Sequence, residues 1–210
     1  MSIVFEAWIG RERKRGKIED LNSYLCGQGS PLVAHPPLDI QKNPIAFAIT
    51  LDADTSLPAE SARRLIETIA HPLNRLRLTE DGRNRLSGYT IIQPRVSIGL
   101  PGTSITRFTR IFADARGTDP YCHSVSDLYQ DLFRESTFHG KAIYDVQAMY
   151  AILHNRFPAE TILSHDLIEG AHVGVAADTK IELFENLPGD YAAFAKRQHR
   201  WIRGDWQIAQ

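Results

Sequence analysis

The chain has 210 residues, of which 43% are hydrophobic and 23% charged, with a formal net charge of −1 at pH 7. This composition suits a globular domain with one sizeable core, and the near-neutral charge gives no reason to expect nucleic acid as a partner. No apolar run approaches the roughly 18 residues of a membrane span, and no signal-peptide pattern is present. We therefore expect the chain by itself to be soluble and cytoplasmic, with Cys26 and Cys122 as reduced thiols rather than a disulfide.

The chain begins with a predicted helix, a loop and a strand. Residues 11–25 carry a basic start and then Ile18, Leu21 and Leu25 on one face, which indicates a short helix. A segment rich in Gly and Pro follows and is predicted to be a loop. The continuous apolar run 45–51 is typical of a strand buried on both faces of a parallel sheet.

A second helix and a second strand are predicted next. Pro58 suits the first turn of a helix, and Thr55 or Ser56 could cap it. Residues 89–99 have the composition of a strand that is interrupted at Pro94.

The second half of the chain predicts three further helices, a strand and a long final helix. Strands that alternate with helices indicate an α/β domain with a largely parallel sheet. In order, these later segments are 105–113, 125–133, 146–153, the strand 179–185 and the helix 192–210.

Two aspartates, Asp52 and Asp54, follow the apolar run 45–51 directly. Ligands of α/β sheets bind beyond the carboxyl ends of strands, where two carboxylates can hold Mg²⁺ or Mn²⁺ on a diphosphate. A solvated turn that leads into the next helix would contain the same residues, so both interpretations stay open. A haloacid-dehalogenase-like phosphatase with Asp52 as nucleophile is a third interpretation, although Thr55 stands one place early for its motif.

Two later segments add groups that suit a transfer reaction. Asp166 follows a short apolar stretch and His165, and its carboxylate could act as a general base or simply cap a helix. Arginines near a helix end suit a diphosphate, and tryptophan faces suit sugar rings. The final helix carries Arg197, Arg200 and Trp201 in this arrangement, and a protein-contact helix is the alternative.

The order of the segments resembles processive family-2-type glycosyltransferases with the GT-A fold: "RKRGKIEDLN", "ITLDADTSLP", "QPR", "FHGKAIYDV", "LSHD" and Arg-x-x-Arg-Trp. The longer strings "HPLNR", "VSDLYQDLF", "ILSHDLIEG" and "RQHRWIRGDWQ" are more similar still to the glycosyltransferase domain of cyclic β-1,2-glucan synthases, glycosyltransferase family 84. The resemblance implies a single GT-A-like domain over residues 1–210, with a mostly parallel sheet flanked by helices. It also implies an inverting glucosyltransferase that uses UDP-glucose, a glucan acceptor and Mg²⁺ or Mn²⁺.

The resemblance implies a role for each matching residue. Asp52 and Asp54 match the Asp-x-Asp pair that binds metal and UDP, and Asp166 matches the general base that deprotonates the acceptor hydroxyl. Two positions depart from the family-2 pattern, since Arg197 replaces a glutamine and His165 a glutamate. The remaining expected donor residues are Lys17, Arg197 and Arg200, and the expected acceptor residues are Gly140, Lys141, His165 and Trp201.

A GT-A enzyme opens with strands that bind the uracil, and the residues before the first predicted helix are too few to form them. We therefore expect a domain without its first strands, cut from a larger multidomain membrane protein. The resemblance places that protein at the cytoplasmic face of the bacterial inner membrane, with the remaining domains of the synthase as partners. A fragment without activity of its own is the remaining alternative.

Overall fold

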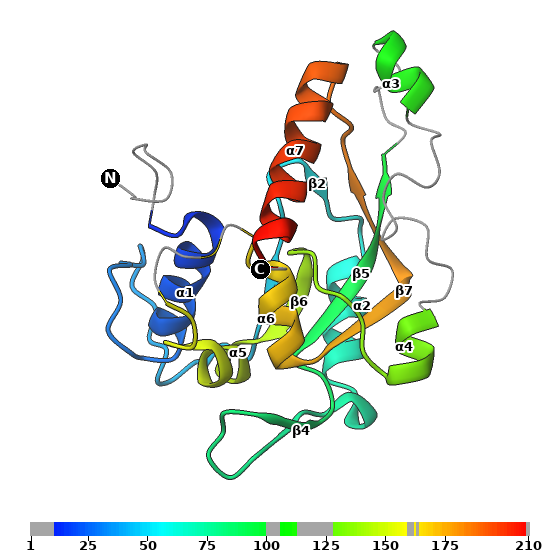
Figure 1. Cartoon of the computed structure of the whole chain (residues 1–210). Helices are drawn as coiled ribbons and strands as arrows, with labels where there is room; N and C mark the ends of the chain where they lie inside the picture. The colour runs from blue at the N-terminus through cyan, green and yellow to red at the C-terminus, as the bar shows by residue number, and fades with distance from the viewer. Residues whose placement is uncertain (1–10, 100–105, 113–127, 159–161, 163, 209–210) are drawn as a thin grey trace.

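The structure, a computed structural model, describes residues 11–99, 106–112, 128–158, 162 and 164–208. It is a mixed α/β arrangement with a central sheet flanked by helices (Figure 1). The helices are α1 (Arg13–Leu25), α2 (Ser61–Ile69), α3 (Arg107–Phe112), α4 (Leu128–Phe133), α5 (Val146–Leu153), α6 (Asp166–Val173) and α7 (Tyr191–Ile208). The strands are β1 (Phe47–Thr50), β2 (Thr55–Ser56), β3 (Arg77–Leu78), β4 (Arg85–Ser87), β5 (Ile91–Ile98), β6 (Ala142–Asp145) and β7 (Val175–Glu185).

The main sheet has the strand order β1-β6-β5-β7-β2, and β3 and β4 form a separate pair. Within the described residues only β5 and β7 pair in parallel, so the prediction of a mostly parallel sheet is wrong. The physical reason is that β6 enters the sheet antiparallel between β1 and β5. Strands β1, β5 and β7 still run in one direction, so their carboxyl ends share one edge of the sheet.

Strand β1 lies at the end of this strand order, and all four of its residues are only partly buried. The prediction that the apolar run 45–51 is buried on both faces is therefore wrong. An apolar run records the hydrophobicity of a strand but not its position in the sheet, which depends on partners far away in the sequence.

Strand β5 continues through Pro94 rather than ending there. Its register against β7 shifts between Pro94 and Arg95, whose partners are Asp178 and Glu182. Proline has no N–H to donate to a sheet ladder and is tolerated at such irregularities. The predicted interruption at Pro94 is therefore wrong for β5, which is continuous, and the irregularity beside it consists of extra residues in β7.

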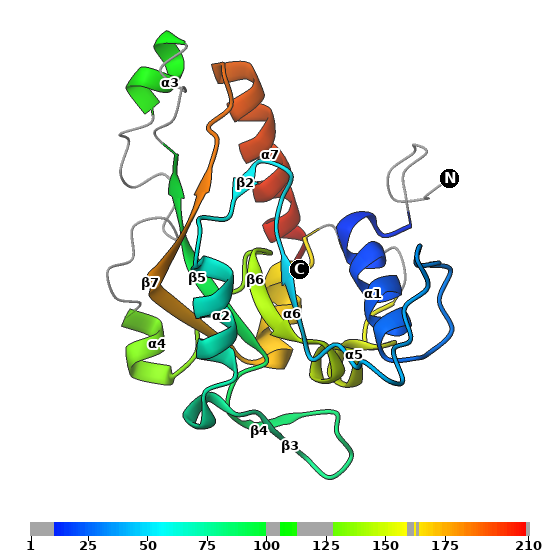
Figure 2. The ribbon, with the colours of Figure 1, turned by 180° about the vertical axis from the view of Figure 1, so that it is seen from behind.

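The core has two parts, one on each face of the sheet. Helix α2 covers one face with Leu65 and Ile69, which pack with Ile92, Ile143 and Ala176. Helices α1, α5 and α6 cover the other face (Figure 2). The alternate residues of the same strands point toward these helices. This alternation is the period-two pattern of a pleated sheet covered on both sides. The buried members on the second face are Leu25, Ile91, Phe138, Ala142, Tyr144, Val146, Met149, Ile152, Val173 and Val175.

Most predicted helices are present, with changed bounds. The helix predicted after Pro58 is α2, but Thr55 and Ser56 do not cap it, because they form β2 against the end of β7. Helices α3 and α4 lie within the predicted segments 105–113 and 125–133, and the remaining parts of both segments lie partly outside the described residues. No helix in the described ranges combines the length and apolarity that crossing a membrane requires. Cys26 is a free thiol, whereas Cys122 lies outside those ranges.

Candidate functional site

Asp52 is held by two lysines at the carboxyl end of β1. Lys14 Nζ, from the first turn of α1, lies 2.6 Å from Asp52 Oδ1 and also donates to the carbonyl oxygen of Gly140 at 2.8 Å. Lys141 Nζ lies 3.1 Å from Asp52 Oδ2. Burial raises the pKa of Asp52, but the hydrogen bonds and charges of the two lysines outweigh it and lower the pKa below its ordinary value. Asp52 is therefore an ionised carboxylate shared by two ammonium groups.

A second carboxylate, Glu185, joins this group from the end of β7. Lys141 Nζ lies 2.7 Å from Glu185 Oε1, and Thr55 donates to the same oxygen at 3.3 Å. Burial lowers the pKa of Lys141, but the charges and hydrogen bonds of Glu185 and Asp52 raise it above its ordinary value. Lys141 is thus a buried ammonium group that bridges β1 and β7.

The carboxylates have the donor chemistry of a divalent-cation site. Oxygens of Asp52, Asp54 and Glu185 all lie within 4.8 Å of one another. Mg²⁺ and Mn²⁺ prefer oxygen ligands of this kind. Both oxygens of Asp52 already contact lysines, whereas Asp54 is exposed and lines a neighbouring pocket. The residues present therefore fit a hard cation, with Asp54 as the more accessible ligand.

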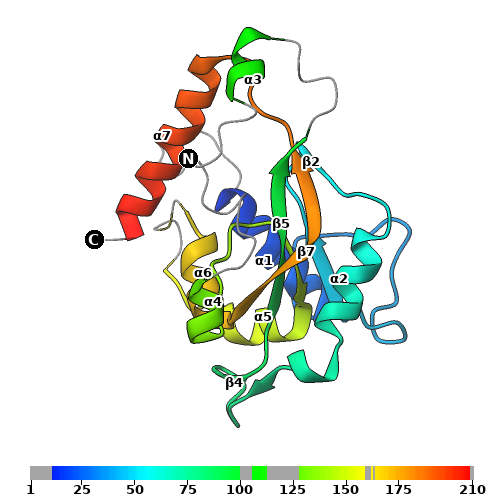
Figure 3. The same cartoon turned by 90° about the vertical axis from the view of Figure 1, so that its right-hand side faces the viewer.

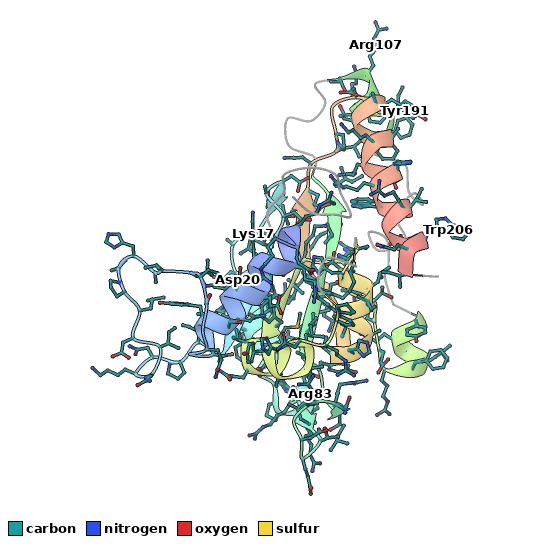
Figure 4. All side chains as sticks on the ribbon, turned by 60° about the vertical axis from the view of Figure 1, so that its left-hand side comes forward. Lys17, Asp20, Arg83, Arg107, Tyr191 and Trp206 are labelled. Atoms are coloured by element: carbon teal, nitrogen blue, oxygen red, sulfur yellow. The ribbon has the colours of Figure 1, made fainter. Side chains whose placement is uncertain are left out.

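Two of the expected site lysines are placed differently from the prediction. Lys17 is exposed on α1 (Figure 4), and no hydrogen bond or ion pair joins it to the described residues of the carboxylate group. Lys14, one helical turn earlier, is the α1 lysine that contacts Asp52. Lys141 was expected to face the acceptor but lies among the carboxylates of the expected donor site.

Asp166 and Gly140 are in close contact beside this group. Asp166 is the first residue of α6, and Gly140 precedes β6 with φ +89. A Cβ atom on Gly140 would lie 2.8 Å from Asp166 Oδ2 and 2.9 Å from its Oδ1. Since Lys14 donates to the Gly140 carbonyl and also binds Asp52, one chain of contacts links Asp166 to the Asp-x-Asp pair.

A pocket of about 630 Å³ lies between the start of α1 and the face of α7. Asp54 is its acidic member, and the segment after β7 supplies apolar lining. Nε of Arg197 is buried and has no hydrogen-bond partner within the described part of the chain. Such an array of cations with an unsatisfied donor suits an anion with several oxygens. The cationic lining consists of Arg13, Lys196, Arg197, Arg200 and Arg203, with His199 beside them.

Helix α7 holds this cationic face beside the segment that carries Asp166. Gly204 lies so close to Ser164 that a Cβ on it would be 2.6 Å from the Ser164 Cβ, and Ser164 also hydrogen-bonds Asp205. The Arg197 guanidinium stacks over the Trp201 ring at 4.8 Å. Figure 3 shows α7 standing on the side of the sheet opposite α2. The contact of α7 with Ser164 thus joins the helix that carries the predicted Arg197, Arg200 and Trp201 to the segment that leads into Asp166.

Sequence reasoning missed several members of the site. Glu185 ends an alternating strand segment, much as Asp52 follows a continuous apolar one, but its distance from Asp52 depends on strand pairing. Lys14 and Arg13 belong to the basic start of the first helix, where only Lys17 was singled out. Lys196 stands in the arginine-rich segment and could have been included on charge alone.

No protein-family profile matches the chain. The cyclic β-(1,2)-glucan synthase NdvB of Rhizobium meliloti (strain 1021) is 41% identical to it over 209 residues. That match covers 96% of this chain and 7% of the length of the synthase. The expected resemblance is confirmed: the chain is a homologue of one segment of the cyclic β-1,2-glucan synthases.

Proposed function

We propose that this chain forms the glucosyl-transfer site of a cyclic β-1,2-glucan synthase, in a GT-A-like arrangement. It would transfer glucose from UDP-glucose to a growing glucan with inversion at the anomeric carbon. The observation that supports this most is the 630 Å³ pocket, where five cationic side chains face Asp54 next to the Asp52 and Glu185 carboxylates. A nucleotide diphosphate has the charge and the oxygen atoms for such a pocket.

The leaving diphosphate is the group that the arginines of α7 would stabilise. Arg197 and Arg200 line the pocket from α7, and Arg13 lines it from α1. As the bond to the anomeric carbon breaks, negative charge develops on the diphosphate, and fixed cations lower the energy of that state. Mg²⁺ or Mn²⁺, held by Asp54 with Asp52 and Glu185, would supply further neutralisation of the diphosphate.

Asp166 is the general base in this proposal. Its carboxylate takes the proton from the 2-hydroxyl of the acceptor as that oxygen attacks the anomeric carbon. The contact with Gly140, whose carbonyl accepts a hydrogen bond from the Asp52-bound Lys14, supports a connection between the proposed base and the proposed donor site. Trp201, partly exposed on α7, offers an aromatic face for an acceptor sugar ring.

The test is calorimetry of UDP and UDP-glucose binding to the chain, with and without Mn²⁺. We expect Mn²⁺-dependent binding that weakens about tenfold or more in Asp54→Ala, since loss of even an outer partner of a metal site commonly costs that much. Asp39→Asn is the matched control, because it neutralises a carboxylate whose ion pair is with Lys42 in an exposed loop. A folded chain that binds neither nucleotide would overturn the proposal.

A trapping experiment separates this proposal from the phosphatase interpretation. A haloacid-dehalogenase-like enzyme forms an aspartyl phosphate at its nucleophile, so Asp52 would then capture beryllium fluoride. We expect no such adduct, and the identity to a glucan synthase favours the transferase.

A further inference from the structure

A buried group of charged side chains lies at the start of α6, beside the proposed base. His165, Glu169 and Arg15 are 9%, 6% and 7% exposed. Arg15 comes from α1, whereas the other two belong to the segment that carries Asp166. Buried charges are costly unless they are paired, so their arrangement needs a structural or functional reason.

Glu169 holds the imidazole of His165 with one oxygen and the guanidinium of Arg15 with the other. His165 Nδ1 donates to Glu169 Oε2 at 2.9 Å, and Arg15 Nε lies 3.6 Å from Glu169 Oε1. Arg15 also pairs with Glu12. The imidazole therefore has a fixed orientation, because its partner is itself tied to α1.

The same imidazole nitrogen faces Asp166 on its other side. Nδ1 of His165 lies 3.4 Å from Asp166 Oδ1, an oxygen that is buried and has no hydrogen-bond partner within the described ranges. Gly140 closes the remaining side of this carboxylate. The position of Asp166 is thus determined by the imidazole and by the glycine backbone.

The charges around His165 favour the imidazolium form. Burial lowers the pKa of His165, but the hydrogen bond to Glu169 and the charges of Asp166 and Glu169 raise it above its ordinary value, against a smaller opposing effect of Lys14. A cation between the two carboxylates offsets the repulsion that they would otherwise exert on each other.

We propose that His165 is a positioning residue, whose ring, held by Glu169 and Arg15, keeps the Asp166 carboxylate fixed against Gly140. The catalytic part of this inference rests on the proposed role of Asp166 as base. If these residues served only to join α1 to α6, the contacts of His165 and Arg15 with Glu169 would be enough. No interaction between His165 and Asp166 would then be needed.

The deciding experiment is an NMR pH titration of the His165 ring in the chain and in two isosteric variants. In Glu169→Gln the midpoint moves to lower pH, because the hydrogen-bonding carboxylate is lost. In Asp166→Asn it also moves to lower pH, because the imidazolium loses its second anionic neighbour. The His71 ring, which caps the turn at Pro72–Asn74, serves as an internal control and keeps its midpoint in both variants.

An unchanged His165 midpoint in folded Asp166→Asn would overturn the positioning role, whatever the activity of the enzyme. If the midpoint moves but Asp166→Asn still transfers glucose, the proposed base is wrong and the coupling stands. Transfer assays of His165→Gln complete the test: we expect a lower kcat, an unchanged KM for UDP-glucose and a changed pH–rate profile. If His165 only joins α1 to α6, the pH–rate profile will be the same in His165→Gln as in the parent enzyme.

Discussion

Asp166 is the single side chain on which the proposed chemistry most depends. Asparagine keeps its size but cannot accept the proton of an acceptor hydroxyl. We expect Asp166→Asn to lower the rate of glucose transfer by about 10²–10⁴-fold, the usual contribution of a general base. UDP binding, measured by calorimetry, should stay close to that of the parent chain, and normal transfer in the variant would contradict the assignment.

Two features require glycine at position 140: its backbone conformation and its close contact with Asp166. Its φ of +89 is strained for other residues, and a Cβ there would lie under 3.0 Å from both oxygens of Asp166. We expect Gly140→Ala to lower the free energy of unfolding by about 1–3 kcal/mol in urea titrations and to reduce transfer. Gly29→Ala is the control, since no neighbouring atom lies within 4 Å of a Cβ at that position. Equal effects of the two substitutions would mean that the contact with Asp166 is unimportant.

The residues that could be predicted are those with a local signal. Asp52 follows an apolar run, Asp166 begins a helix, and Arg197 lies in an unusually basic helix. Glu185 and Lys14 have comparable local signals, but their meaning depends on strand and helix packing between distant segments. Sequence therefore suggests the chemical groups of this site more readily than it suggests which of them touch.

One buried hydrogen bond contributes to the attachment of helix α1 to the sheet. The hydroxyl of Tyr144, in β6, donates to Asn22 Oδ1, in α1, at 2.8 Å, and both residues are at most 4% exposed. We expect Tyr144→Phe to cost about 1–3 kcal/mol of unfolding free energy, because it leaves a buried oxygen unpaired. Tyr129→Phe, on the exposed side of α4, should change the free energy by less than about 0.5 kcal/mol. Loss of stability no larger than in this control would show that this hydrogen bond contributes little to holding α1.

Helices and strands whose boundaries carry a sequence signal, such as a capping residue, were predicted well. Those without such a signal were missed. The bounds of α5 match the prediction, and Asp145 accepts a hydrogen bond from Ala148 at its start. Strand β6 was missed because its four residues run into α5 without an intervening turn. This omission led to the wrong expectation of a mostly parallel sheet, since β6 is the strand that reverses direction between β1 and β5.

Across the whole molecule, charge is distributed far less evenly than the net charge of −1 suggests. Five Arg and Lys side chains line one pocket, so an anionic ligand meets a locally positive surface. We expect UDP affinity to fall steeply from about 0.1 M to about 1 M salt, as the screening length shortens from about 10 to 3 Å. Uridine, which lacks the diphosphate, should bind with little salt dependence. Equal salt dependence of UDP and uridine binding would mean that the diphosphate does not bind in this cationic pocket.

The strand order of the main sheet also determines how the site forms over time. None of its neighbouring strands are joined by a hairpin, so every pair requires the meeting of segments that are distant in the sequence. Chains dominated by such pairings fold slowly, on a scale of about milliseconds to seconds. The carboxylates of Asp52 and Glu185 come together only after β6 and β7 have both found their partners. Nucleotide binding should therefore appear in the last kinetic phase of refolding, after the helical signal has recovered.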